Sequence, residues 1–92
     1  MKQDPQAEEL ITLIRLAHDN SDLDLEIQEI FINAVKRLRQ GNAVNYVAYR
    51  LVNGLSDYYL THIKSAHNPY VNAVYNLASQ LQISYRKFLW HP

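Results

Sequence analysis

The sequence predicts an all-α fold: an antiparallel up-down-up-down four-helix bundle, formed by a single domain over residues 1–92. Apolar residues recur at intervals of three and four, which is the period of an amphipathic helix. The 92 residues include only two glycines and three prolines, so few positions interrupt a helix. The connections between the predicted helices are short, and short connections make neighbouring helices run antiparallel.

The first helix is predicted over residues 5–18. Asp4 is a suitable N-cap, and Pro5 suits the first helical position. The stretch "HDNSD" that follows consists of residues that favour caps and turns, so it predicts the first connection. The apolar side of this helix comprises Leu10, Leu13, Ile14 and Ala17.

The second helix is predicted over residues 22–40, with Ser21 or Asp22 at its start. Ser21 and Asp24 have the spacing of a capping box. Cations in the last turn, followed by Gly41, are typical of a helix C-terminus. The predicted inner face comprises Leu23, Ile27, Ile30, Phe31, Ala34 and Leu38.

The third helix is predicted over residues 43–64, capped by Asn42 or Asn45. Gly54 lies in its middle, where glycine costs about 1 kcal/mol relative to alanine. We therefore interpret Gly54 as a point where two helices approach closely. The predicted buried side comprises Val44, Val47, Ala48, Leu51, Leu55, Tyr58, Tyr59 and Ile63.

The fourth helix is predicted over residues 69–89. Asn68 followed by Pro69 is a strong helix start signal. Its predicted inner face comprises Val71, Val74, Tyr75, Ala78, Leu81, Tyr85 and Phe88.

The composition argues against several classes of protein. The formal net charge is zero, so a dedicated nucleic-acid binder is not expected. No apolar run approaches the roughly 20 residues of a membrane span, and the first ten residues lack the apolar core of a signal peptide. The absence of cysteine excludes disulfides and cysteine-based zinc sites and mildly favours the cytoplasm.

The sequence contains no recognisable catalytic or metal-binding motif. Its serines lie in no nucleophile motif, and its two glycines are isolated, so no glycine-rich loop can hold a phosphate. His62 and His67 are five residues apart rather than the three or four that face each other on a helix. We therefore expect no enzymatic activity, no metal site and no cofactor.

The C-terminal end is the candidate binding site. Residues 1–46 hold eight acidic and five basic residues, whereas residues 47–92 hold one acidic and four basic residues. The stretch "YRKFLWHP" combines cations with the only tryptophan, and Trp and Arg are enriched at binding hot spots. In the alternative interpretation, Trp90 packs back on the bundle instead of contacting a partner. The candidate partner-binding residues are Tyr85, Arg86, Lys87, Phe88 and Trp90.

Two stretches carry a resemblance to a known family. They are "AVKRLRQGNAVNYVAYRLVNGLSDYYL" and "NPYVNAVYNLASQLQISYRKF". The chain resembles the immunity proteins of pediocin-like (class IIa) bacteriocins, the enterocin A immunity type, over roughly residues 8–88. The matching features are Gly41 after a turn of leucine and cations, the Tyr58–Tyr59 pair, and the Tyr85–Arg86 pair in the last helix.

The resemblance implies an antiparallel four-helix bundle that protects a lactic acid bacterium from a pore-forming peptide. The implied partner is the mannose phosphotransferase permease with docked bacteriocin, bound from the cytoplasmic side. The implied location is the cytoplasm, with the inner face of the membrane as the place of action. In the family, the C-terminal half sets which bacteriocin is resisted, and this half includes the candidate residues.

Two other functions are compatible with a small helical bundle. A helical adaptor or regulatory module would bind another protein through the third and fourth helices. A nuclease-inhibiting immunity protein of the colicin type would need a strongly acidic face to meet a basic nuclease. The C-terminal half here is basic, so this second alternative ranks lower.

Overall fold

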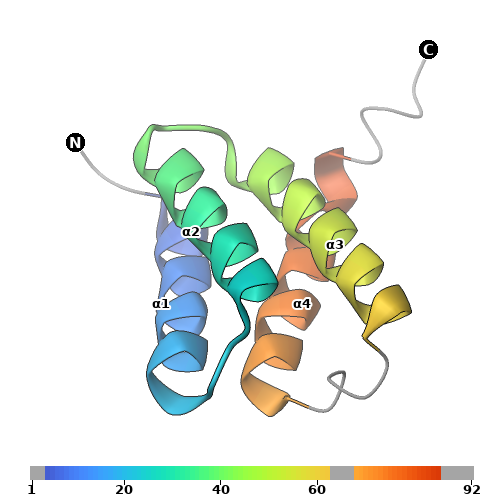
Figure 1. Ribbon diagram of the computed structural model, residues 1–92. Coiled ribbons are helices and arrows are strands. Elements are labelled where there is room, and N and C mark those ends of the chain that lie inside the picture. Colours follow the sequence, from blue (N-terminus) through green and yellow to red (C-terminus); the bar gives the residue numbers. More distant parts are fainter. Residues whose placement is uncertain (1–3, 63–67, 86–92) are drawn as a thin grey trace.

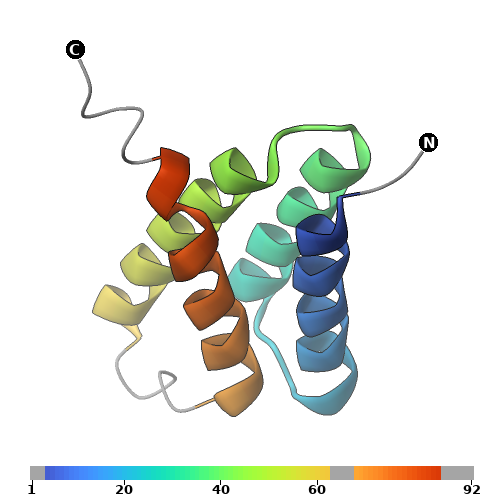
Figure 2. The same ribbon diagram turned by 180° about the vertical axis from the view of Figure 1, so that it is seen from behind.

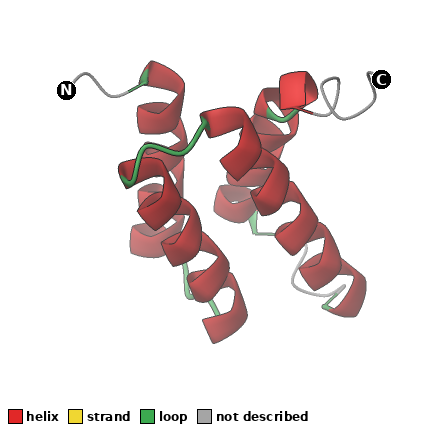
Figure 3. Cartoon of the chain, turned by 90° about the horizontal axis from the view of Figure 1, so that it is seen from above, coloured by secondary structure: helices red, strands yellow, loops and turns green. Residues whose placement is uncertain are grey.

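The computed structural model describes residues 4–62 and 68–85 and confirms the predicted all-α four-helix bundle. Its helices are α1 (Pro5–Asn20), α2 (Leu25–Arg39), α3 (Val44–Thr61) and α4 (Pro69–Leu81). The α2–α3 connection lies at the end where α1 begins and α4 ends, and the α1–α2 connection lies at the opposite end (Figure 1). Figure 3 shows helices joined by loops throughout the described part of the chain.

The helices are packed unevenly around the bundle. α3 packs closely on both α2 and α4, and α1 packs closely on α4 but makes far fewer contacts with α2. The view from behind shows α1 and α4 side by side (Figure 2). This looser α1–α2 pair leaves a groove that is described below.

One apolar core joins the four helices. Leu10, Leu51, Leu55 and Val74 are among its most fully buried side chains, at 2 % exposure or less. Nearly all residues of the predicted inner faces that the structure describes are buried or partly buried against this core. The apolar spacing in the sequence did not predict four buried residues: Ala7, Ile11, Val52 and Gln82.

Two helix starts follow the capping chemistry expected from the sequence. The Asp4 carboxylate accepts a 2.8 Å hydrogen bond from the Gln6 amide, and Pro5 begins α1. The Asn68 side chain accepts hydrogen bonds from the amides of Tyr70 and Val71 at 2.9 and 3.2 Å. These bonds satisfy amides that have no partner within the helix.

The capping residues of the other two helices were predicted wrongly. α2 begins at Leu25, with Asp24 as its cap, rather than at residue 22 after Ser21 or Asp22. The Ser21 hydroxyl instead donates a 2.6 Å hydrogen bond to the Ala17 carbonyl, so it helps to end α1, which extends to Asn20 rather than 18. α3 begins after Ala43, whose side chain cannot cap.

Neither candidate asparagine caps α3, because the N-cap position is Ala43. Each asparagine side chain instead donates a hydrogen bond elsewhere. The Asn42 side chain donates a 3.0 Å hydrogen bond to the Arg37 carbonyl. The Asn45 side chain donates a 3.1 Å hydrogen bond to the Ser84 hydroxyl, near the end of the described chain.

The helix C-termini also refine the predicted boundaries. α2 ends at Arg39, and Gly41 follows with φ of +91°, a conformation that glycine adopts without strain. α3 ends at Thr61 rather than 64. α4 spans Pro69–Leu81, and residues 83–85 are again helical after a turn at residue 82. The predicted end at residue 89 lies outside the described residues.

Gly54 faces Ile30 of α2, but the two helices do not approach there closely enough to require a glycine, so the prediction of a close approach was wrong. A methyl group at Gly54 would lie 3.5 Å from the side-chain carbons of Ile30. This is an ordinary van der Waals distance, so the site has room for alanine.

Candidate partner-binding site

The site is built around Tyr85, the last residue of the described chain. Its ring lies against two tyrosines on the first turns of α3. The ring centroids are 5.6 Å apart for Tyr46 and Tyr85, in an edge-on arrangement, and 4.9 Å apart for Tyr49 and Tyr85. Such tilted and edge-to-face pairs are favourable for aromatic rings. We call Tyr46, Tyr49 and Tyr85 the tyrosine cluster.

Two further contacts hold the tyrosine cluster in place. The Asn45–Ser84 hydrogen bond joins α3 to the residue before Tyr85. The Arg50 guanidinium carbon lies 6.0 Å from the centre of the Tyr46 ring, at the outer limit of a cation–π contact. The chain therefore leaves the described bundle at an aromatic surface with a cation beside it.

The structure places only one of the five predicted site residues. Tyr85 is half-buried and packed on α3. Arg86, Lys87, Phe88 and Trp90 lie outside the described residues. The sequence patterns did not single out Tyr46 and Tyr49, which meet Tyr85 in the structure. Their three-residue spacing, which puts both on one side of a helix, was the available signal.

A second group of tyrosines joins α3 to α4 further along the bundle. The Tyr59 hydroxyl donates a 3.0 Å hydrogen bond to the Asn72 side-chain oxygen, and the Tyr59 and Tyr75 ring centroids are 5.7 Å apart. Burial, followed by the proximity of Tyr75 and Tyr58, raises the pKa of Tyr59 above its ordinary value. Tyr59 therefore remains a neutral hydrogen-bond donor in this contact.

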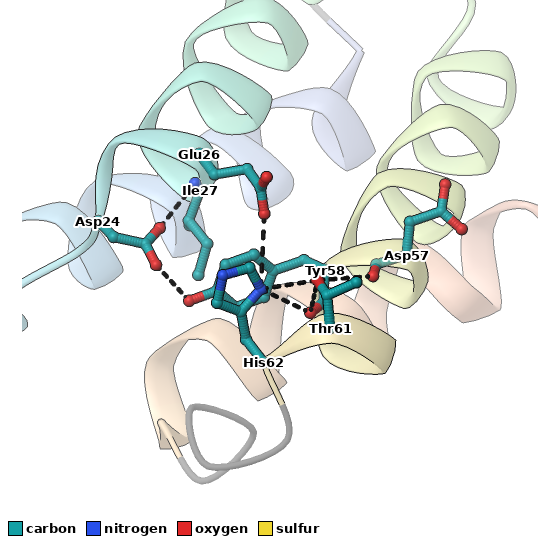
Figure 4. Close-up of polar contacts among 7 residues, drawn as sticks. All are labelled: Asp24, Glu26, Ile27, Asp57, Tyr58, Thr61 and His62. Carbon is teal, nitrogen blue, oxygen red and sulfur yellow. Dashed lines mark hydrogen bonds and ion pairs between the residues drawn. The ribbon is translucent and has the colours of Figure 1, made fainter.

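A third group of contacts joins the C-terminal end of α3 to the N-terminal end of α2 (Figure 4). The buried Tyr58 donates its hydroxyl hydrogen to the Asp24 carboxylate, which also accepts a 3.1 Å hydrogen bond from the Ile27 amide. His62 stacks on the Tyr58 ring, with centroids 4.2 Å apart, and its Nδ1 lies 3.7 Å from the Glu26 carboxylate. These side chains hold two helices together and are already engaged with one another.

Across the described residues, no three His, Cys, Asp or Glu side chains gather in a way that could hold a metal ion. Within residues 4–62 and 68–85, none of the helices combines the length and hydrophobicity that a membrane crossing requires.

Comparison with known proteins identifies one related family. The model of the bacteriocin immunity protein family matches residues 3–82, which is most of the chain. The comparisons with curated proteins and with solved structures return no match. The matched range includes Tyr46 and Tyr49 but ends before Tyr85, so the tyrosine cluster lies where the matched part of the chain meets the segment that follows it.

Proposed function

The chain belongs to the bacteriocin immunity protein family, and we propose that it protects its cell from a pore-forming class IIa bacteriocin. The family match over residues 3–82 is the observation that carries this proposal. In this proposal, the protein acts by binding and not by catalysis. The four-helix bundle serves as a rigid support that presents one end to a partner.

We propose further that the partner is the mannose phosphotransferase permease with docked bacteriocin, bound from the cytoplasmic side. This matches what the family resemblance implies for the mechanism, and it locates the protein in the cytoplasm, at the inner face of the membrane. The contact residues in this proposal are Tyr85, Arg86, Lys87, Phe88 and Trp90.

The geometry of the tyrosine cluster supports the choice of this end. Tyr85 is held against Tyr46 and Tyr49, so the segment after it starts from a fixed position on the bundle. A segment that starts from a fixed position loses less conformational freedom on binding than one that follows an unanchored chain. Tyrosine and arginine are also residues that contribute strongly at interfaces.

Protection can be tested in cells. The full chain is expressed in a lactic acid bacterium sensitive to pediocin-like peptides, which is then challenged with a panel of them. We expect resistance to one or a few peptides. Uniform sensitivity across the panel, with the protein shown to be folded and expressed, would reject the immunity function and favour the helical adaptor that the sequence also allows.

The contact surface is tested by a chain that ends after Tyr85. It keeps the tyrosine cluster but lacks residues 86–92, and we expect it to lose protection while keeping the thermal stability of the full chain. As a control, Asp57→Asn changes an exposed charge on α3 outside the proposed contact residues and should leave protection unchanged. Full protection by the shortened chain would contradict the proposed contact residues without affecting the immunity function.

A further inference from the structure

A groove of about 460 Å³ lies between α1 and α2. It exists because α1 packs closely on α4 and only loosely on α2. Its volume falls within the range of about 300–1,000 Å³ that is usual for small-molecule sites. The apolar part of its lining comprises Ile14, Leu23, Phe31, Ile32 and Val35.

Three cations also line the groove. Arg15 reaches the groove from α1, and Lys36 and Arg39 reach it from α2. The only carboxylate in the lining is Asp19, which lies 3.5 Å from His18 Nδ1. Among the described residues, none of the three cations forms an ion pair. Their charges therefore remain available to a ligand.

The sequence of α2 explains why apolar and cationic groups meet here. Ile32, Lys36 and Arg39 are spaced by four and three residues, so they follow one another along one side of the helix. Phe31 is buried beside this row, whereas Ile32 is 62 % exposed. The exposed isoleucine and the unpaired cations make this side of α2 amphipathic. Ile32 remains largely exposed in the described part of the chain, so burying its apolar surface under a ligand would be favourable.

We propose that this groove binds one anionic lipid molecule, with an acyl chain on the apolar lining and a phosphate head group at Arg15, Lys36 and Arg39. Charge complementarity selects an anionic head group over a zwitterionic one. The concave lining suits a single chain better than a flat bilayer surface. This site is distinct from the tyrosine cluster, and the proposal does not depend on the immunity function.

Binding is tested with the full chain and lauroyl lysophosphatidylglycerol, kept below its critical micelle concentration and followed by methyl NMR. We expect saturable shifts at Ile14, Ile32 and Val35. Lauroyl lysophosphatidylcholine, which has the same chain and no net charge, should bind much more weakly. Equal binding of the two lipids, or no shifts at these methyl groups, would overturn the proposal.

Charge-matched variants test the head-group site. Lys36→Gln with Arg39→Gln removes two cations from the groove, and we expect affinity for the anionic lipid to fall about 30-fold, as two near-surface cations imply. Arg37→Gln with Arg50→Gln removes the same charge from a separate α2–α3 pocket and should bind as the original chain does. Equal loss in both variants would show that only net charge matters and would overturn the proposed site.

The apolar lining is tested by Ile32→Ser, with Leu60→Ser as its control because Leu60 is 77 % exposed on α3. Only the first change should weaken binding of the monomeric lipid. Both positions are exposed, so both variants should remain folded. Binding to phosphatidylglycerol vesicles without binding to the monomeric lipid would replace the proposed site with adsorption to a membrane surface.

Discussion

Individual tyrosines connect the helices of this bundle in different ways. Tyr58 is buried and donates to Asp24, Tyr59 donates to Asn72, and Tyr85 contributes only its ring to the described contacts. A tyrosine can bury its ring and still place its hydroxyl against a polar partner, which suits the edge of a small core. The sequence pattern placed Tyr58, Tyr59 and Tyr85 on the inner faces of their helices, but it could not predict their partners, because these lie on other helices or at their ends.

The Tyr58 hydroxyl provides a test at this scale. Tyr58→Phe keeps the ring in the core but removes the hydrogen bond to Asp24, so we expect the free energy of unfolding to fall by about 1–2 kcal/mol. Urea denaturation measures the change. Tyr70→Phe, at a position 38 % exposed, is the control and should have little effect. Equal stability of the two variants would mean that the Asp24 contact adds nothing to stability.

The helices themselves depend on local chemistry at their ends and on packing along their sides. Asp4 and Asn68 cap α1 and α4 as expected, because the necessary groups lie within a few residues of each other. The cap of α2 was missed because three candidates, Ser21, Asp22 and Asp24, compete within four residues. Asp24 has the additional contact with Tyr58 of α3, a partner that local spacing cannot reveal.

The two glycines are expected to respond to the same substitution in opposite directions. Gly54→Ala should raise the free energy of unfolding by up to about 1 kcal/mol, because a methyl group fits beside Ile30 and alanine favours the helix. Gly41→Ala should lower it by about 1 kcal/mol, because φ is +91° there. Thermal or urea unfolding of both variants measures the sign of each change in the free energy of unfolding.

Gly54→Leu extends this comparison. A methyl group at Gly54 already contacts Ile30, so we expect the larger leucine side chain to crowd this contact and to make the variant less stable than the original chain. An unchanged melting temperature would refute the helix contact at this position.

At the scale of the whole molecule, stability and recognition are expected to reside in different parts of the chain. The core is made by the four helices, and the tyrosine cluster joins α3 to the end of the described chain. Four of the five proposed contact residues follow this cluster, and all five lie beyond the matched family range. Changes after Tyr85 should therefore affect protection more than folding.

Trp90→Ala tests this separation. Trp90 lies outside the described residues, and we expect its loss to abolish protection in the challenge assay while leaving the melting temperature nearly unchanged. The matched change Leu60→Ala, at an exposed position of α3, should affect neither. A large fall in stability on Trp90→Ala would instead support the alternative in which Trp90 packs back on the bundle.

Patterns within short stretches of sequence were enough to predict the helical class, the four helices, most core positions and the family. Amphipathic spacing and capping act over a few residues, so a single chain displays them directly. Only the tertiary structure placed Tyr85 between Tyr46 and Tyr49, joined Asp24 to Tyr58, and opened the cation-lined groove between α1 and α2. These features depend on how closely separate helices approach, which is set by the packing of all four around one core.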